Sequence, residues 1–173
     1  MPSDKSPRVG IVMGSDSDWP KIEAAAAALD EFAVPHEVRV MSAHRTPDVV
    51  QQYAAAVAGR GLKVIIAAAG GAAHLAGVVA AHTTLPVIGL PVPTSLAGGL
   101  DSLLSIVQMP GDVPVATVGV GPGGPRNAGL LAVQILATSD AALAQRLAEF
   151  KKSLAEKVAA KDKALQAKLA DEK

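Results

Sequence analysis

The sequence predicts an α/β protein with a three-layer, doubly wound parallel sheet and a long C-terminal helix. Short, continuously apolar runs alternate with longer stretches of helical pattern, which is typical of parallel strands that helices cover on both faces. Half of the 173 residues are hydrophobic but only four are aromatic, so the core must consist mainly of Ala, Val, Leu and Ile. Such a core suits close packing of helices on a sheet.

The predicted strands and helices alternate along the chain as far as residue 137. The strands are expected at 8–13, 36–41, 62–68, 86–90 and 113–118, and the helices at 19–33, 47–60, from after Gly71 to about 82, 99–108 and 128–137. Right-handed crossovers between the parallel strands then give a flavodoxin-like sandwich.

The tail of the chain has a different pattern. Apolar side chains recur in it every three or four residues, at positions 143, 147, 150, 154 and 158 and again at 165 and 169. This periodicity predicts a long amphipathic helix without a strand of its own. We therefore expect an α/β domain with the functional residues at 1–140, followed by a helix at 141–173 that packs on its own or a neighbouring subunit.

Composition excludes several classes of protein. Lys plus Arg equals Asp plus Glu at 16 each, so no nucleic acid or membrane surface is indicated as a partner. Cysteine is absent, which excludes disulfides, thiolate metal sites and a cysteine nucleophile. The polar residues 1–8 do not resemble a signal peptide, and no apolar run approaches the ~20 residues of a membrane helix. We expect a soluble, cytoplasmic protein.

Three polar loops follow the first three predicted strands. They occupy residues 14–18, 42–45 and 69–74, and each leads directly into a predicted helix. The carboxyl ends of parallel strands meet at one edge of a sheet, where the N–H groups of helix N-termini attract anions. The sequence therefore predicts a ligand site at this edge.

The first loop combines a turn-forming glycine with Ser15, Ser17 and Asp18. Its ordinary interpretation is a strand–turn–helix junction in which Asp18 caps the helix and Pro20 lies in the first turn. Its functional interpretation is a phosphate and ribose site, with serine hydroxyls on the phosphate and Asp18 on a ribose hydroxyl. The Gly-Lys-Ser/Thr ending of a P-loop is absent, so ATP hydrolysis is not supported.

The second loop holds Ser42, His44 and Arg45 just before a helix start, where Thr46 is the expected N-cap and Pro47 the first helical residue. An arginine binds phosphate through two parallel hydrogen bonds. An imidazole gives and takes protons near neutral pH. A lone loop histidine is more often a packing or surface residue, but this one neighbours the predicted anion site, so we select it for acid–base work.

The third loop contains Gly70 and Gly71, which allow a flat ligand to approach the backbone closely. A tight connection between strand and helix would use the same residues, so this signal is weak by itself. His74 follows the glycines and is a candidate to face the pocket, whereas His36 and His82 are expected to be structural.

The conspicuous motifs are GSDSDW at 14–19, SAHRTP at 42–47, AGGAAHL at 69–75, GLDSLLSIVQMP at 99–110 and NAGLLAVQIL at 127–136. Together they resemble the bacterial N5-carboxyaminoimidazole ribonucleotide mutase family over roughly residues 9–137. SAHRTP combined with SIVQMP is highly specific, while the glycine loops alone are not.

The resemblance implies an enzyme of de novo purine (IMP) biosynthesis that needs no metal and no cofactor. It moves a carboxylate from the exocyclic nitrogen N5 of an aminoimidazole ribonucleotide to ring carbon C4. His44 matches the catalytic histidine. Ser15, Asp18 and Arg45 match substrate-binding positions, Ser17 and Ser42 are expected to share the phosphate, and the third loop adds the candidates Gly70, Gly71 and His74.

The same resemblance implies a homo-octamer whose sites are completed by neighbouring subunits. Segment 103–109 is a candidate wall from such a neighbour. A further implied relationship is the handover of the unstable carbamate substrate from an ATP-dependent N5-carboxyaminoimidazole ribonucleotide synthetase.

Two positions and one loop depart from the family pattern. Ala68 and Ala76 stand where Gly and Pro are common, and the Gly/Pro-rich segment 119–127, a candidate loop for closing over the site, differs from the usual form. None of these changes affects the catalytic or phosphate-binding candidates, so we expect activity to be kept.

Other functions remain in competition. An aminoimidazole ribonucleotide carboxylase resembles SAHKGP at the second loop, where this chain has Arg45-Thr46-Pro47. The carboxylase and hydrolase of pincer-cofactor synthesis relies on a cysteine. A non-catalytic flavodoxin-like domain would stack aromatic residues on flavin, and a phosphoacceptor domain would need an acidic cluster with a nearby lysine. The mutase agrees best with the residues present.

Overall fold

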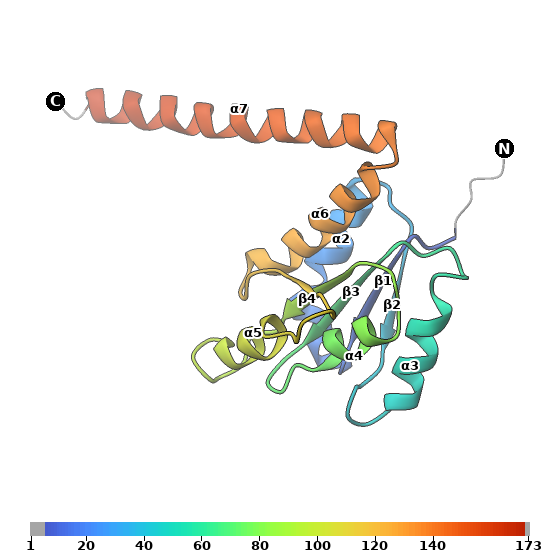
Figure 1. Cartoon of the computed structure of the whole chain (residues 1–173). Coiled ribbons are helices and arrows are strands. Elements are labelled where there is room, and N and C mark those ends of the chain that lie inside the picture. The colour runs from blue at the N-terminus through green and yellow to red at the C-terminus, as the bar shows by residue number, and fades with distance from the viewer. Residues whose placement is uncertain (1–5, 172–173) are drawn as a thin grey trace. The chain divides into compact units, whose positions relative to one another are not determined.

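The computed structural model describes residues 6–171 and contains a five-stranded parallel sheet in the order β2-β1-β3-β4-β5 (Figure 1). This order is that of flavodoxin-like folds, so the predicted fold class is confirmed. The strands are β1 (Val9–Met13), β2 (His36–Val40), β3 (Val64–Ala69), β4 (Val87–Pro91) and β5 (Ala116–Thr117).

Helices cover both faces of the sheet. Figure 1 shows α2 and α6 on one face and α3, α4 and α5 on the other. The helices of this layered part are α1 (Trp19–Ile22), α2 (Ala24–Glu31), α3 (Pro47–Ala56), α4 (Leu75–Ala81), α5 (Leu100–Val107) and α6 (Gly123–Ala137), with a short 3-10 helix, η1, at Asp16–Asp18.

The three central strands are covered most completely. Every residue of β1, β3 and β4 is buried, whereas β2 forms an edge at which Val38 and Val40 are exposed. Small residues bring the layers together, as expected for a core with few aromatic residues. A Cβ atom at Gly129 of α6 would lie 2.5 Å from the carbonyl oxygen of Ala25 in α2, so only glycine permits this approach of the two helices.

The fifth strand is much shorter than the six residues predicted at 113–118. The strand consists of Ala116 and Thr117, opposite Ile88 and Gly89 of β4, and the N–H of Val118 just after it donates to the carbonyl oxygen of Gly89 at 3.1 Å. Pro114 lies within the predicted range, and a proline has no N–H group to donate to a neighbouring strand. The apolar run therefore predicted the position of β5 correctly but not its extent.

The sixth helix begins earlier than predicted. Residues 123–127, expected to belong to a loop, form its first turn, with Pro125 at a position where a helix tolerates proline. Arg126 in this turn pairs with Glu31 of α2 at 2.7 Å. The ion pair and the tight packing of Gly124 on Gly119 hold the segment against its own domain.

The chain divides after Leu136 into two compact units. The second contains the predicted long helix, α7 (Ala141–Asp171), on which Leu154, Val158, Leu165 and Leu169 are exposed. Within residues 6–171, no helix combines the length and apolar character needed to cross a membrane.

Candidate active site

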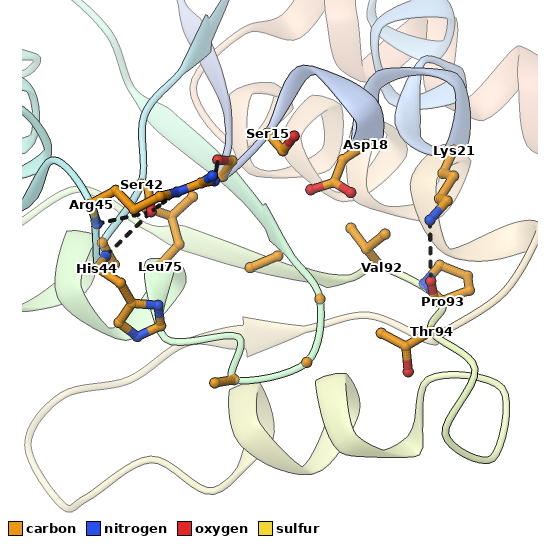
Figure 2. A pocket seen from close by; sticks show the side chains of 16 residues that line it. Ser15, Asp18, Lys21, Ser42, His44, Arg45, Leu75, Val92, Pro93 and Thr94 are labelled. Atoms are coloured by element: carbon orange, nitrogen blue, oxygen red, sulfur yellow. Dashed lines mark hydrogen bonds between the residues drawn. The ribbon is translucent and has the colours of Figure 1, made fainter.

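A cavity of about 540 Å³ lies at the carboxyl ends of β1 to β4, at the edge that the sequence predicts (Figure 2). The loops after all four strands contribute to it. Its lining consists of Gly14, Ser15, Asp18, Lys21, Ser42, Ala43, His44, Arg45, Ala69, Gly70, Gly71, Ala72, Leu75, Val92, Pro93 and Thr94. A second hollow of about 320 Å³ adjoins it at Ser15, Ser42 and Arg45.

Hydroxyl groups organise the loop after β1. The side chain of Ser15 is the N-cap of η1, where its Oγ atom accepts the N–H of Ser17, and the two hydroxyl oxygens lie 2.8 Å apart. Asp18 occupies the N-cap position of α1 but forms no capping hydrogen bond with its side chain. The expectation that Asp18 caps this helix is therefore wrong, and its carboxylate lies in the cavity wall instead.

Burial shifts the titration of the Asp18 carboxyl group. Partial burial raises the pKa of this carboxyl above its ordinary value, although the positive charges of Lys21 and Arg45 act in the opposite direction. Both cations also line the cavity. A carboxyl group with a shifted pKa that lines a cavity between two cations is a candidate for a functional role.

Ser42 fixes the backbone of the loop after β2. Its Oγ atom accepts hydrogen bonds from the N–H groups of His44 and Arg45, at 3.3 and 3.2 Å. Thr46 stands at the N-cap position of α3, yet its hydroxyl bonds the N–H and C=O of Ser42 and caps no helical N–H group. The N-cap role predicted for the Thr46 side chain is therefore wrong, whereas Pro47 begins the helix as expected.

The guanidinium group of Arg45 joins the first two loops. Its terminal nitrogen donates to the carbonyl oxygen of Gly14 at 2.6 Å, and its Nε atom donates to the hydroxyl of Ser42 at 3.4 Å. A guanidinium has five N–H donors, so others remain for an anion in the cavity. The side chain is thereby held in place before any ligand arrives.

Two imidazole rings meet beside the cavity. The Nε2 atom of His44 lies 2.8 Å from Nδ1 of His74, and the ring planes are nearly perpendicular, at 81°. In this hydrogen bond the N–H group of one ring donates to the unprotonated nitrogen of the other. His74 and Ser17 are not part of the cavity lining. Each of them contacts a residue that is, His44 and Ser15 respectively.

The loop after β3 forms a wall of bare backbone. Gly71 has a φ angle of +67°, a conformation that favours glycine. A Cβ atom on Gly70 would lie 3.4 Å from both the carbonyl oxygen of Val92 and the Cγ2 atom of Thr94. Gly71 is therefore required for its left-handed backbone conformation, and Gly70 permits the close approach of two cavity walls.

The other candidates lie outside the cavity. Ala68 and Ala76 are fully buried, and no residue of segment 119–127 is part of the cavity lining. His36 hydrogen-bonds the carbonyl oxygen of Val34, and His82 ends α4. Among residues 6–171 no group of three or more His, Asp or Glu side chains is placed to hold a metal ion.

Sequence reasoning missed the wall that follows β4. Val92, Pro93 and Thr94 line the cavity, and Lys21 reaches across to donate to the carbonyl oxygen of Pro93 at 3.4 Å (Figure 2). The fourth strand was predicted, so the rule that ligands bind at strand ends pointed to this segment. Val92 and Pro93 have no polar side chain that would have marked them as candidate site residues.

Comparison with known proteins identifies relatives that span almost the whole chain. The model of the family described as AIR carboxylase matches residues 8–157. N5-carboxyaminoimidazole ribonucleotide mutase of Mycobacterium tuberculosis is 61% identical over 165 residues, which cover 95% of this chain and 94% of that protein. The mutase of Bacillus subtilis is 60% identical and covers 83% of this chain and 88% of that protein.

A solved structure agrees with these relationships. The crystal structure of Treponema denticola PurE superimposes with a TM-score of 0.84 at 31% identity, covering 92% of this chain and 98% of that one. Fold, motifs and overall similarity thus lead to one conclusion: the chain belongs to the AIR carboxylase family.

Proposed function

We propose that this chain is an N5-carboxyaminoimidazole ribonucleotide mutase. It converts its substrate to 4-carboxy-5-aminoimidazole ribonucleotide in purine biosynthesis, without a metal or a cofactor. The observation that carries the proposal is the cavity in which an imidazole, His44, stands next to a pre-positioned guanidinium, Arg45. The names of the relatives from M. tuberculosis and B. subtilis support the choice of reaction.

The phosphate binds among the first two loops. The free N–H groups of Arg45 and the hydroxyls of Ser15, Ser17 and Ser42 are its donors. Ser42 fits this role because its oxygen already accepts N–H groups of its own loop, which leaves its hydroxyl proton to donate. Charge-assisted bonds of this kind are about twice as strong as neutral ones.

The ribose and the imidazole ring lie toward the remaining walls. The Asp18 carboxylate accepts a hydrogen bond from a ribose hydroxyl. The backbone at Gly70 and Gly71 faces the flat ring, and Leu75 and Val92 supply apolar surface beside it. This arrangement places the reacting atoms on the side of His44.

The reaction consists of two proton transfers around the movement of carbon dioxide. His44 donates a proton to N5 as the bond between N5 and the carboxyl carbon breaks, which releases carbon dioxide and leaves aminoimidazole ribonucleotide. The electron pair of C4 then attacks the carbon dioxide. His44 takes back a proton from C4 and restores the aromatic ring, so one imidazole performs both steps. His74, in contact with His44, supports the ring in its place.

The moving carboxylate must stay in the site between the two steps. Of the four N–H groups at residues 71–74, that of Gly71 donates to Ser102, that of Ala73 to Gly71 and that of His74 to Ala72. Within the described part of the chain, the N–H of Ala72 has no partner. We therefore assign stabilisation of the carboxylate to Ala72, a narrower choice than the whole glycine-rich wall.

The chain also acts as part of an assembly, which we propose to be a homo-octamer with its sites at subunit interfaces. Large apolar side chains are exposed on α5 and the loop before it, next to the wall formed by Thr94. They are Leu96, Leu100, Leu104 and Val107. A neighbouring subunit that covers them brings segment 103–109 into an interface. We assign the exposed apolar residues of α7, Leu154, Val158, Leu165 and Leu169, to further interfaces of the same assembly. We also propose that an ATP-dependent synthetase hands over the unstable carbamate substrate.

Light scattering of the purified chain checks this assembly. We expect the mass of eight chains, and Leu104→Glu, which places a charge on the exposed α5 surface, is expected to lower the mass. A parent protein that is monomeric at micromolar concentration contradicts the octamer.

Turnover with defined substrates tests the reaction itself. We expect the parent protein to convert N5-carboxyaminoimidazole ribonucleotide without added bicarbonate. Synthesis from aminoimidazole ribonucleotide that depends on bicarbonate, with no use of the N5-carboxylated substrate, would identify a carboxylase instead. No turnover of either substrate, in either direction, sinks the enzyme assignment.

Substitutions in the second loop separate chemistry from binding. His44→Asn is expected to bind the product but to lower kcat about 10²- to 10⁴-fold, the range of general acid–base catalysis. Arg45→Ala is expected mainly to raise KM about 10- to 100-fold, because it removes a charge-assisted hydrogen bond to phosphate. Equal kcat values for His44→Asn and the parent would refute the role of the histidine.

Asp18→Asn is expected to lower kcat/KM without lowering the Tm at pH 7. Because burial raises the pKa of Asp18 in the folded protein, the ionised carboxylate destabilises the fold above that pKa. The destabilisation decreases as the pH falls through this pKa and is absent below the lower pKa of the unfolded chain. The variant should therefore have a Tm at pH 7 equal to or above that of the parent, and the difference should shrink on acidification. Its kcat/KM should fall about 10- to 100-fold. A lower Tm at pH 7 with unchanged kcat/KM would contradict both expectations.

A further inference from the structure

The hydrogen-bond ladder between β3 and β4 ends in an unusual way at the cavity. Its last direct bond joins the N–H of Val92 to the carbonyl oxygen of Ala69 at 2.9 Å. At the start of the ladder, the N–H of Ile65 donates to the carbonyl oxygen of Pro86. With the same spacing between partners, the next bond after that of Val92 would join the N–H of Gly71 to the carbonyl oxygen of Val92. This direct bond is not formed.

A serine hydroxyl occupies the missing position. The N–H of Gly71 donates to Oγ of Ser102 at 2.9 Å, and this hydroxyl donates to the carbonyl oxygen of Val92 at 2.7 Å. Two successive hydrogen bonds span a greater distance than one. The hydroxyl therefore separates the two strands at the point where both become walls of the cavity.

Ser102 is suited to hold this position permanently. Its side chain is 0% exposed, so no solvent molecule competes for these two hydrogen bonds, and the adjacent carboxylate of Asp101 also lies within reach of the hydroxyl. A second bond ties the same helix to the same wall, because Thr94 donates to the carboxylate of Asp101 at 2.6 Å. The bond from Thr94 also lowers the pKa of Asp101, which keeps the acceptor ionised. The N-terminus of α5 is thus attached to the backbone on both sides of the gap.

We propose that Ser102 is a positioning residue that sets the width of the cavity between the wall at 70–72 and the wall at 92–94. It touches neither the substrate nor the reacting atoms. The inference rests on the proposed function, since it concerns the part of the cavity that receives the imidazole ring. The phosphate anchors come from the loops after β1 and β2, so Ser102 governs the placement of the ring and not the hold on the phosphate.

Ser102→Ala tests the proposal through a split between kcat and KM. Without the hydroxyl, the N–H of Gly71 and the carbonyl of Val92 can bond directly and draw the walls together. We expect kcat to fall at least about tenfold, since misplacement of the reacting groups by less than 1 Å is costly, while KM stays within about threefold. An unchanged kcat would overturn the proposal, as would a rise in KM at constant kcat.

Thr117→Val is the matched control. Thr117 lies in β5, outside the cavity lining, and its Oγ1 atom is buried without a hydrogen-bond partner in the described chain. The substitution removes a buried hydroxyl, as Ser102→Ala does, yet leaves no partner unsatisfied. We expect kcat and KM of this variant to equal those of the parent. A loss of kcat as large as that of Ser102→Ala would assign the effect to the loss of any buried hydroxyl and would overturn the proposal.

Two further measurements keep the proposal testable if Ser102→Ala folds poorly. Ser102→Thr retains the hydroxyl and is expected to keep kcat within about threefold of the parent even if its Tm falls. In the unsubstituted protein, the Gly71 amide hydrogen is expected to exchange with solvent at least about 100-fold more slowly than that of Ala72, its unpaired neighbour. Equal exchange rates would overturn the hydroxyl bridge, whether or not the proposed reaction is found.

Discussion

The position of β1 between two parallel neighbours determines where the first three polar loops of this protein meet. All five of its residues are buried, and it pairs with β2 on one side and β3 on the other. Parallel pairing brings the carboxyl ends of these strands to one edge, which the helices on the two faces leave open. The polar loops have no other place to emerge, so Asp18, His44 and Arg45 meet although the sequence separates them.

Serine hydroxyls stabilise this edge where regular secondary structure ends. Backbone N–H groups beyond the last ladder bond or before the first helical turn need acceptors. Ser15 accepts that of Ser17, Ser42 accepts those of two loop residues, and Ser102 accepts that of Gly71. Each hydroxyl also has a proton to donate. That of Ser102 goes to the carbonyl oxygen of Val92, and that of Ser15 goes to the carboxylate of Asp16 through a long bond of 3.4 Å, which an incoming phosphate can replace. The hydroxyl of Ser42 can donate to the phosphate directly.

Most of the fold and about half of the site could be predicted because each depends on local pattern. Continuous apolar runs located the strands, and the polar loops after them located the cavity. Prediction failed where distant partners decide the outcome. The pairing of His74 with His44, the bond of Thr46 to Ser42, and the role of Ser102 depend on distances between side chains that no spacing in the sequence encodes. The length of β5 was overestimated for a different reason. Pro114 was visible in the sequence, but the prediction followed the apolar run around it.

The register of β1 has a consequence for the order in which this protein is made. Val9 lies between His36, which leaves the ribosome soon after it, and Val64, which follows much later. Until β3 has been synthesised, one edge of β1 lacks its partner in the nascent chain. The cavity needs Thr94 as well, and its width needs Ser102. More than half of the polypeptide must therefore be translated before the whole cavity is in place, and until then the N-terminal segment is an unfinished sheet with an apolar centre.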